Sequence, residues 1–259
     1  MSDSVCKKID IRGIPVDNVN LDEAFSAVLS YTKTDDFHMI CTPNAEIVQL
    51  CIEDADTAAL IRRSDLIIPD GAGVVLASKI LGTPLKAKTP GCELGERIVK
   101  EAGANGLRVY FLGGKPGIAA LAEQKLQEKY PDFKTVGMHD GYFKKEGEEN
   151  DAVIAAINEA APNVLFVCLG VPAQEKWIDA NYRHIDARVF LCAGATVDFL
   201  AGHVKRAPAW ISRVGLEWFY RFLKEPKRLF KRYFIDDMQI ISLIIKYRKQ
   251  HRKNTGVQA

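Results

Sequence analysis

The sequence lacks any long apolar run, and no stretch approaches the roughly 20 residues that a membrane-spanning helix needs. Residues 1–8 also lack the apolar segment of a secretory signal peptide, so we expect a cytoplasmic protein. The six cysteines include no C-x-x-C pair, which argues against a zinc or redox motif. Cys41, Cys168 and Cys192 lie in or beside apolar runs, where a thiol is typical of a buried core.

Two phosphate-binding motifs are also missing. The P-loop pattern G-x-x-x-x-G-K-[ST] is absent, and residues 71–76 have Leu76 where a dinucleotide fingerprint needs its third glycine. A soluble nucleotide-binding Rossmann enzyme therefore remains only an alternative, and it would have to bind its nucleotide without the complete fingerprint.

Apolar runs alternate with helix-like patterns along the first 200 residues. The expected strands are Lys8–Ile11, Phe37–Cys41, Leu66–Ile68, Leu107–Leu112, Thr135–His139, Val164–Leu169 and Arg188–Cys192. The expected helices are Leu21–Thr32, Ala45–Arg63, Gly73–Leu81, Leu94–Ala102, Ile118–Lys129, Asp151–Ala160, Gln174–Asn181 and Ala195–Leu200. This alternation predicts an α/β, Rossmann-like fold with a mostly parallel sheet and helices on both faces. We expect a core over residues 1–202 and a helical appendage over 203–259.

Polar and glycine-rich turns follow five of the expected strands, and in a parallel sheet such turns share one edge. Asp70 ends one apolar run, and its carboxylate is suited either to accepting a proton or to capping the helix that begins near Ala72. The turn 113–117 resembles a phosphate cradle that binds anions through free N–H groups. His139-Asp140 is compatible with a second base or with a turn-capping Asp. Together these turns favour a nucleotide-type ligand.

The C-terminal segment is strongly basic. Residues 205–253 hold 14 Lys and Arg against 4 Asp and Glu, a net charge of +10, whereas the rest of the chain has a net charge of −8. Basic residues gather on one side of a helical wheel and aromatic residues on the other, which favours an anionic membrane surface. The alternatives are that the aromatic side packs on the core or on another subunit, giving a homo-oligomer. Nucleic acid is disfavoured, because the two kinds of residue segregate.

An ordered set of motifs resembles the WecG/TagA/CpsF glycosyltransferase family over about residues 9–235. The motifs are Thr42-Pro43-Asn44, Pro69-Asp70-Gly71, Phe111-Leu112-Gly113-Gly114, Gly170-Val171-Pro172-Ala173-Gln174-Glu175-Lys176-Trp177, Gly194-Ala195-Thr196-Val197-Asp198-Phe199, Arg206-Ala207-Pro208 and Gly215-Leu216-Glu217-Trp218. The resemblance implies an inverting transferase with a Rossmann-like core. It would pass N-acetylmannosamine from UDP-ManNAc to undecaprenyl-diphosphate-linked N-acetylglucosamine, for teichoic acid linkage units or a related cell-surface polysaccharide. It would act peripherally on the inner face of the cell membrane.

The resemblance also implies roles for individual residues. Asp70 matches the proposed general base, with Thr42 as its catalytic neighbour. The substrate-binding positions are Asn44, Lys88, Gly113, Gly114, Gln174, Arg221, Arg228 and Lys231. No cofactor and no metal are implied, and the sequence has no Asp-x-Asp pair on a strand-end loop.

One motif departs from the family pattern. The expected Arg-x-x-Gly-x-Asp-Leu reads Lys88-Thr89-Pro90-Gly91-Cys92-Glu93-Leu94, and Lys and Arg bind phosphate differently. This leaves a different UDP-sugar donor open. A non-catalytic membrane adaptor is a further alternative. Glu175 near a helix start is interpreted as a first-turn charge that the helix dipole favours.

Overall fold

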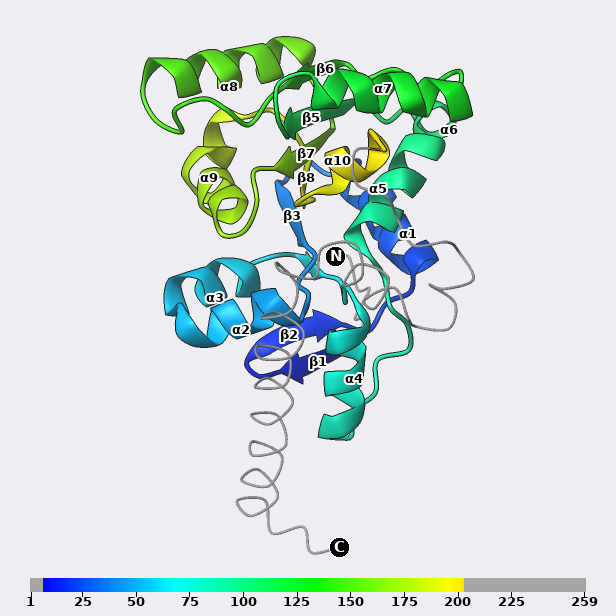
Figure 1. Cartoon of the computed structure of the whole chain (residues 1–259), viewed down its shortest axis with the longest axis vertical. Helices are drawn as coiled ribbons and strands as arrows, with labels where there is room; N and C mark the ends of the chain where they lie inside the picture. The colour runs from blue at the N-terminus through cyan, green and yellow to red at the C-terminus, as the bar shows by residue number, and fades with distance from the viewer. Residues whose placement is uncertain (1–6, 203–259) are drawn as a thin grey trace, which may run out of the picture.

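The computed structural model describes residues 7–202, and over this range it is an α/β fold with a central parallel sheet (Figure 1). The sheet strands are β3 (His38–Cys41), β4 (Leu66–Ile67), β5 (Val109–Gly113), β6 (Gly137–His139), β7 (Val164–Cys168) and β8 (Val189–Cys192). Their spatial order is β4-β3-β8-β7-β5-β6, and every neighbouring pair is parallel. The predicted fold class is therefore confirmed.

Helices cover both faces of this sheet, as Figure 1 shows. One face carries α2 (Ala45–Glu53), α3 (Ala55–Arg62), α8 (Glu148–Ala160) and α9 (Ala173–Asn181). The other carries α1 (Leu21–Tyr31), α5 (Gly91–Lys100), α6 (Ala102–Asn105), α7 (Ile118–Lys129) and α10 (Thr196–Leu200). The remaining helical elements are α4 (Ala72–Leu81) and a 3₁₀ turn at Tyr182–His184 that follows α9.

Side chains alternate between the two faces along each strand, as the pleat requires. In β8, Val189 and Leu191 pack with the α5 side, whereas Phe190 and Cys192 pack with the α9 side. Cys41 also faces α9. Because both faces are covered, nearly every residue of β3, β4, β5, β7 and β8 is buried, which explains the continuous apolar runs in the sequence.

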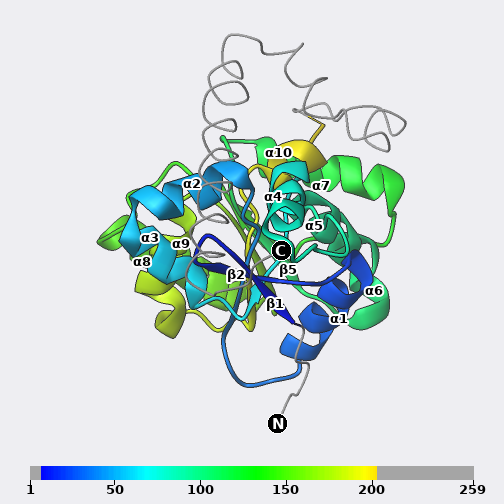
Figure 2. The same ribbon diagram turned by 90° about the horizontal axis from the view of Figure 1, so that it is seen from below.

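The first expected strand does not belong to the main sheet. Lys8–Ile11 forms β1, which pairs antiparallel with β2 (Ile14–Asp17), a strand that the sequence analysis missed. The turn between them places Arg12 and Gly13 at φ +59° and +89°, and the Asp10 carboxylate accepts a hydrogen bond from the Gly13 N–H at 3.0 Å. Figure 2, seen from below, shows this hairpin in front of the main sheet, and β1 packs against α4.

The single helix expected over residues 45–63 is two helices. Asp54 ends α2, with its N–H donating to the Leu50 carbonyl at 2.7 Å. Its carboxylate then begins α3 by accepting from the Asp56 and Thr57 N–H groups at 3.0 and 3.1 Å. An Asp at this position stabilises a new helix start more than it does a helix interior, so the chain turns there.

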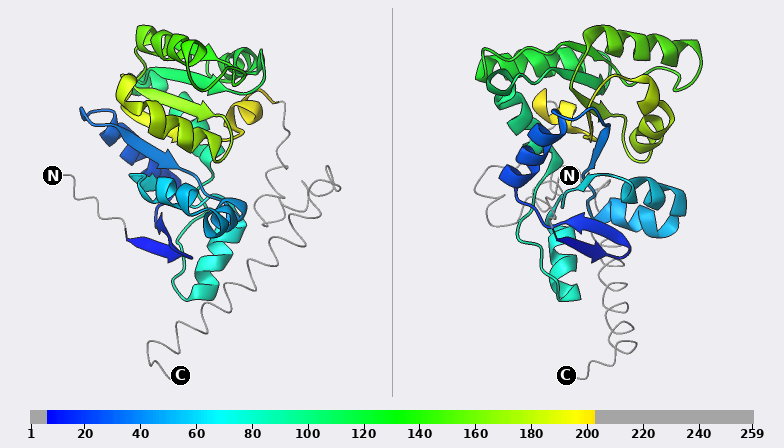
Figure 3. Two further views of the ribbon diagram at one scale, coloured as in Figure 1. Left: turned by 90° about the vertical axis from the view of Figure 1, so that its left-hand side faces the viewer. Right: turned by 180° about the vertical axis from the view of Figure 1, so that it is seen from behind.

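The parallel strands all point to one side of the molecule, as the left view of Figure 3 shows for the blue β3 and the green strands. Their carboxyl ends therefore form one edge, from which the loops of the candidate site emerge. Of the helices within residues 7–202, none is both long and apolar enough to cross a bilayer. The appendage predicted at 203–259 lies outside the described residues.

Candidate functional site at the carboxyl edge of the sheet

Asp70 lies three residues beyond β4, in a turn that is held against the turn after β3. The Asp70 N–H donates to the Pro43 carbonyl at 3.2 Å, and the Pro69 carbonyl accepts from the Thr89 N–H at 2.8 Å. The N-cap of α4 is Gly71, at φ +92°, so Asp70 does not occupy the capping position. Its half-buried side chain therefore belongs to the strand-end turn.

Thr42 joins the end of β3 to the end of β8. Its hydroxyl donates to the Cys192 carbonyl at 3.1 Å. The first residue of α5, Gly91, packs so closely against it that an added Cβ would lie 2.8 Å from the Thr42 Cγ2. The Thr42 side chain is thus fixed on two sides.

Asn44 is the N-cap of α2. Its Oδ1 accepts from the Ile47 N–H at 3.0 Å, so this oxygen has a structural role. The group that remains for a ligand is the Nδ2 amide. Thr42, Asn44 and Asp70 come from two neighbouring strand ends, which brings the three predicted residues into one region of the edge.

Lys88 lies in the connection between α4 and α5 and is half-buried. The next residue, Thr89, is fully buried, with its hydroxyl donating to the Val19 carbonyl at 2.9 Å and its N–H to Pro69. The bond to Pro69 holds the Lys88 loop against the turn that carries Asp70. The departure from the family motif therefore falls beside the candidate base.

Gly113 and Gly114 form a tight turn at the end of β5. Their φ angles are +125° and +75°, and a Cβ on Gly113 would lie 2.3 Å from the Cys168 carbonyl oxygen. Only glycine fits so close to neighbouring backbone. The Gly114 N–H already donates to the Cys168 carbonyl at 3.3 Å, so it is not one of the free donors that the sequence analysis expected of a phosphate cradle. A ligand role for this turn stays a prediction.

Gln174 is buried near the start of α9 and has partners at both ends of its amide. Its Oε1 accepts from the Gly194 N–H at 3.0 Å, and its Nε2 donates to the Glu175 Oε1 at 2.9 Å. It links α9 to the turn after β8. If Gln174 contacts substrate as predicted, its amide oxygen and nitrogen must do so while they also bond to Gly194 and Glu175.

The sequence predicts that Glu175 is a charge in the first turn of a helix. It does lie in the first turn of α9, but it is only 2% exposed. Burial raises the pKa of its carboxyl, and the hydrogen bond from Gln174 opposes this only in part. Its neighbours include Cys41 and Cys192, and the ligand atoms of all three lie within 4.8 Å of one another. No sequence pattern links residues so far apart, so sequence reasoning missed this cluster.

His139 and Asp140 lie at the far end of the edge, after β6. The Asp140 carboxylate accepts from the Tyr142 N–H at 2.8 Å, which supports the turn-capping interpretation. These residues line a shallow pocket of about 400 Å³ together with Tyr142, Phe143, Glu149, Ala152 and Val153. Asp70 does not line this pocket. Arg221, Arg228 and Lys231 lie outside the described residues.

Comparisons with known proteins identify a family and named relatives. The model of the glycosyl transferase WecG/TagA/CpsF family matches residues 9–254. The chain is 35% identical over 191 residues to the N-acetylglucosaminyldiphosphoundecaprenol N-acetyl-beta-D-mannosaminyltransferase of Bacillus subtilis (strain 168), covering 73% of each chain. It is 32% identical over 224 residues to the enzyme of the same name from Staphylococcus aureus (strain MRSA252), covering 86% of this chain and 87% of that relative.

Proposed function

This chain belongs to the glycosyl transferase WecG/TagA/CpsF family, and we propose that it transfers N-acetylmannosamine from UDP-ManNAc to undecaprenyl-diphosphate-linked N-acetylglucosamine. The enzyme is a hexosyltransferase. The names of the two relatives support the acceptor and the transferred sugar. The structural observation that carries the proposal is the meeting of the β3 and β4 turns, which holds Asp70 beside the segment of Thr42 and Asn44.

The proposed chemistry is a direct, inverting displacement. The Asp70 carboxylate takes the proton from the acceptor hydroxyl while that oxygen attacks the anomeric carbon of the donor, and UDP leaves from the opposite side. A positioned general base contributes about 10²–10⁴-fold to such a step. Thr42 stands next to the base with its hydroxyl oriented by the Cys192 carbonyl.

The negative charge on the leaving diphosphate needs positively charged groups in addition to those of residues 7–202. The chain outside residues 205–253 carries a net charge of −8, whereas those residues carry +10. We propose that Arg221, Arg228 and Lys231 reach the edge and bind diphosphate, because preorganised cations there would stabilise the developing charge. The segment 203–259 would also attach the enzyme peripherally to anionic lipid on the inner face of the membrane.

Metal independence is part of the proposal. Within residues 7–202, the only group of three or more His, Cys, Asp and Glu side chains with ligand spacing is Cys41, Glu175 and Cys192. This group does not include Asp70. The sequence also offers no Asp-x-Asp pair at a strand end, where a metal would hold a sugar diphosphate.

The test is a screen of UDP-sugar donors against a short-chain lipid-diphosphate-N-acetylglucosamine, with and without EDTA. We expect UDP release with UDP-ManNAc and no loss in EDTA. Asp70→Asn is expected to keep the fold and UDP binding and to lose about 10²–10⁴-fold in turnover. The matched control is Asp132→Asn, an exposed Asp in the connection between α7 and β6. If Asp70→Asn turns over substrate as fast as the control, Asp70 is not the general base.

Two alternatives give different results in the same screen. Another donor in the family would give UDP release with a different UDP-sugar, and the Lys88 motif is where such a preference would arise. A soluble Rossmann enzyme would instead be stabilised by NAD rather than UDP-sugars in a thermal shift assay. For the tail, activity of Arg221→Ala and Arg228→Ala equal to wild type would exclude these residues from the site.

A further inference from the structure

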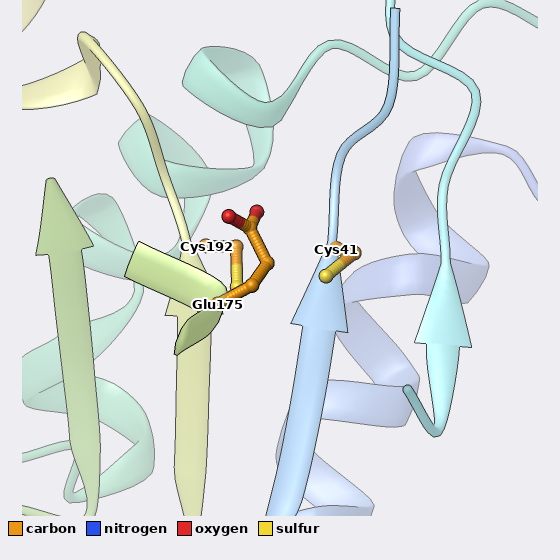
Figure 4. A group of neighbouring side chains, drawn as sticks. All are labelled: Cys41, Glu175 and Cys192. Carbon is orange, nitrogen blue, oxygen red and sulfur yellow. The ribbon is translucent and has the colours of Figure 1, made fainter. Parts of the chain in front are cut away.

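Cys41, Cys192 and Glu175 form a side-chain cluster just inside the carboxyl edge of the sheet. Cys41 ends β3, Cys192 ends the neighbouring β8, and Glu175 comes from the first turn of α9. Figure 4 shows the Cys41 sulfur directed toward the other two side chains. One ligand atom of each residue lies within 4.8 Å of those of the other two.

The cluster is closed off from solvent. Cys41 is 1% exposed, Cys192 is 0% exposed and Glu175 is 2% exposed. A buried carboxylate is costly unless its oxygens are paired. Oε1 of Glu175 accepts from the Gln174 amide at 2.9 Å, whereas within residues 7–202 Oε2 is buried without a partner in good hydrogen-bond geometry, and the Cys192 thiol is the carboxylate's other polar neighbour. A buried polar atom without a well-aligned partner calls for a physical explanation, and a bound ion is one of the standard ones.

We propose that Cys41, Cys192 and Glu175 bind a thiophilic divalent cation, with Zn²⁺ as the best fit. Two sulfur ligands favour Zn²⁺ over the hard cations Mg²⁺ and Ca²⁺. In a tetrahedral zinc site with Zn–S near 2.3 Å and Zn–O near 2.0 Å, ligand atoms lie about 3.5–3.8 Å apart. The three atoms therefore need to close by about 1.3 Å at most from their present limit of 4.8 Å.

The surroundings support this assignment. The Ser64 hydroxyl lies 3.1 Å from the Cys41 sulfur and donates toward it, which is the kind of outer contact that orients a metal ligand. The amino end of α9 adds partial positive charge near Glu175 and offsets the net −1 of one dication with two thiolates and one carboxylate. Binding releases one proton from each thiol, and a third where the carboxyl is protonated, while the metal takes their place.

A cation here would tie β3, β8 and α9 together. Thr42 follows Cys41 directly and Gln174 precedes Glu175 directly, so the metal would fix the segments that carry two predicted site residues. Asp70 is not a member of the cluster, so the cation would act as a structural clamp and not on the reacting atoms, and because its ligands are buried it would not be lost to EDTA during a turnover assay.

The test titrates the full, reduced, chelator-treated chain with Co²⁺ under anaerobic conditions and follows its absorption. We expect one Co²⁺ per chain, with thiolate charge-transfer bands and the intense visible bands of tetrahedral Co²⁺, and full reversal by Zn²⁺. We also expect Zn²⁺ to raise the melting temperature, because a ligand that binds only the folded state stabilises it. A wild-type Co²⁺ spectrum without thiolate bands would overturn the proposal, whatever the variants do.

The variants locate the site. Cys41→Ala and Cys192→Ala should each weaken Co²⁺ binding at least roughly tenfold, a loss that even outer-shell changes reach. Glu175→Gln removes the third ligand with little change in shape and should also weaken binding. The matched control is Cys168→Ala, a buried cysteine at the end of β7 whose residue packs on the opposite face of the sheet. Equal binding by the Cys41→Ala/Cys192→Ala double variant and the wild type would refute the site.

Discussion

Replacing Gly91 by alanine tests whether the close packing of α5 on Thr42 shapes the site. The added Cβ would lie 2.8 Å from Thr42 Cγ2, 2.9 Å from Oγ1 and 3.0 Å from Cβ. Thr42 is β-branched and so has little rotamer freedom. Its hydroxyl is also bound to the Cys192 carbonyl. Either α5 or the β3 turn must therefore move.

The magnitude follows from two opposing effects. Overpacking of a well-packed site costs about 1–3 kcal/mol, whereas alanine in place of glycine in a helix returns at most about 1 kcal/mol. We expect Gly91→Ala to lower the free energy of unfolding by about 1–2 kcal/mol, which corresponds to roughly 2–8 °C in Tm for a chain of this size. Turnover should fall as well, because catalysis is sensitive to displacements near 1 Å.

Urea denaturation and steady-state UDP release measure the two effects. The matched control is Gly103→Ala in α6, where an added Cβ meets nothing within 4 Å, so its stability should stay level or rise. In a Thr42→Ser background, which lacks Cγ2, the cost of Gly91→Ala should shrink by at least about 0.5 kcal/mol. If Gly91→Ala and Gly103→Ala unfold at the same urea concentration and Thr42→Ser shows no coupling, the packing argument fails.

Two further predictions separate structural from chemical roles. Asn44→Asp keeps a good N-cap but loses the Nδ2 donor, so its free energy of unfolding should stay within about 0.5 kcal/mol of wild type while transferase activity falls; Asn44→Ala should cost about 1 kcal/mol. Because burial raises the pKa of Glu175 above its usual 4.5, the metal-free folded state holds that proton more tightly, and the stability of the chelator-treated wild type should decrease as pH rises above 4.5. Glu175→Gln should lose this dependence, so its urea midpoint relative to wild type should rise with pH; parallel curves would contradict the raised pKa.

Periodicity predicted the main sheet well, because strands that are buried on both faces must be continuously apolar. It did not predict that Lys8–Ile11 pairs with Ile14–Asp17 instead of joining that sheet. The reason is a tertiary contact: Asp17 is buried and accepts from the Ile67 N–H of β4 at 2.8 Å. A local sequence pattern cannot predict this bond, because its two residues lie 50 positions apart in the chain.

The candidate site also has one part that the sequence predicted and one part that it did not. Strand-end position was enough to place Thr42, Asn44 and Asp70 together, since a parallel sheet fixes where its carboxyl ends lie. The roles of Gln174 and Glu175 depend instead on how deeply the first turn of α9 is buried against β8. Charged residues at a helix start predict a solvent-exposed turn. Only the packing of α9 in the structure shows that its first turn is buried.

The turn at the end of β8 is hydrogen-bonded both to the β3 turn and to α9. The Cys192 carbonyl accepts from Thr42, and two residues later the Gly194 N–H donates to Gln174. Pro43, next to Thr42, accepts from the Asp70 N–H. The contacts therefore run without a gap from Asp70 through the β3 turn and the β8 turn to α9. The backbone of Asp70, the proposed base, is therefore fixed before substrate arrives, which is what general-base catalysis would require of its scaffold.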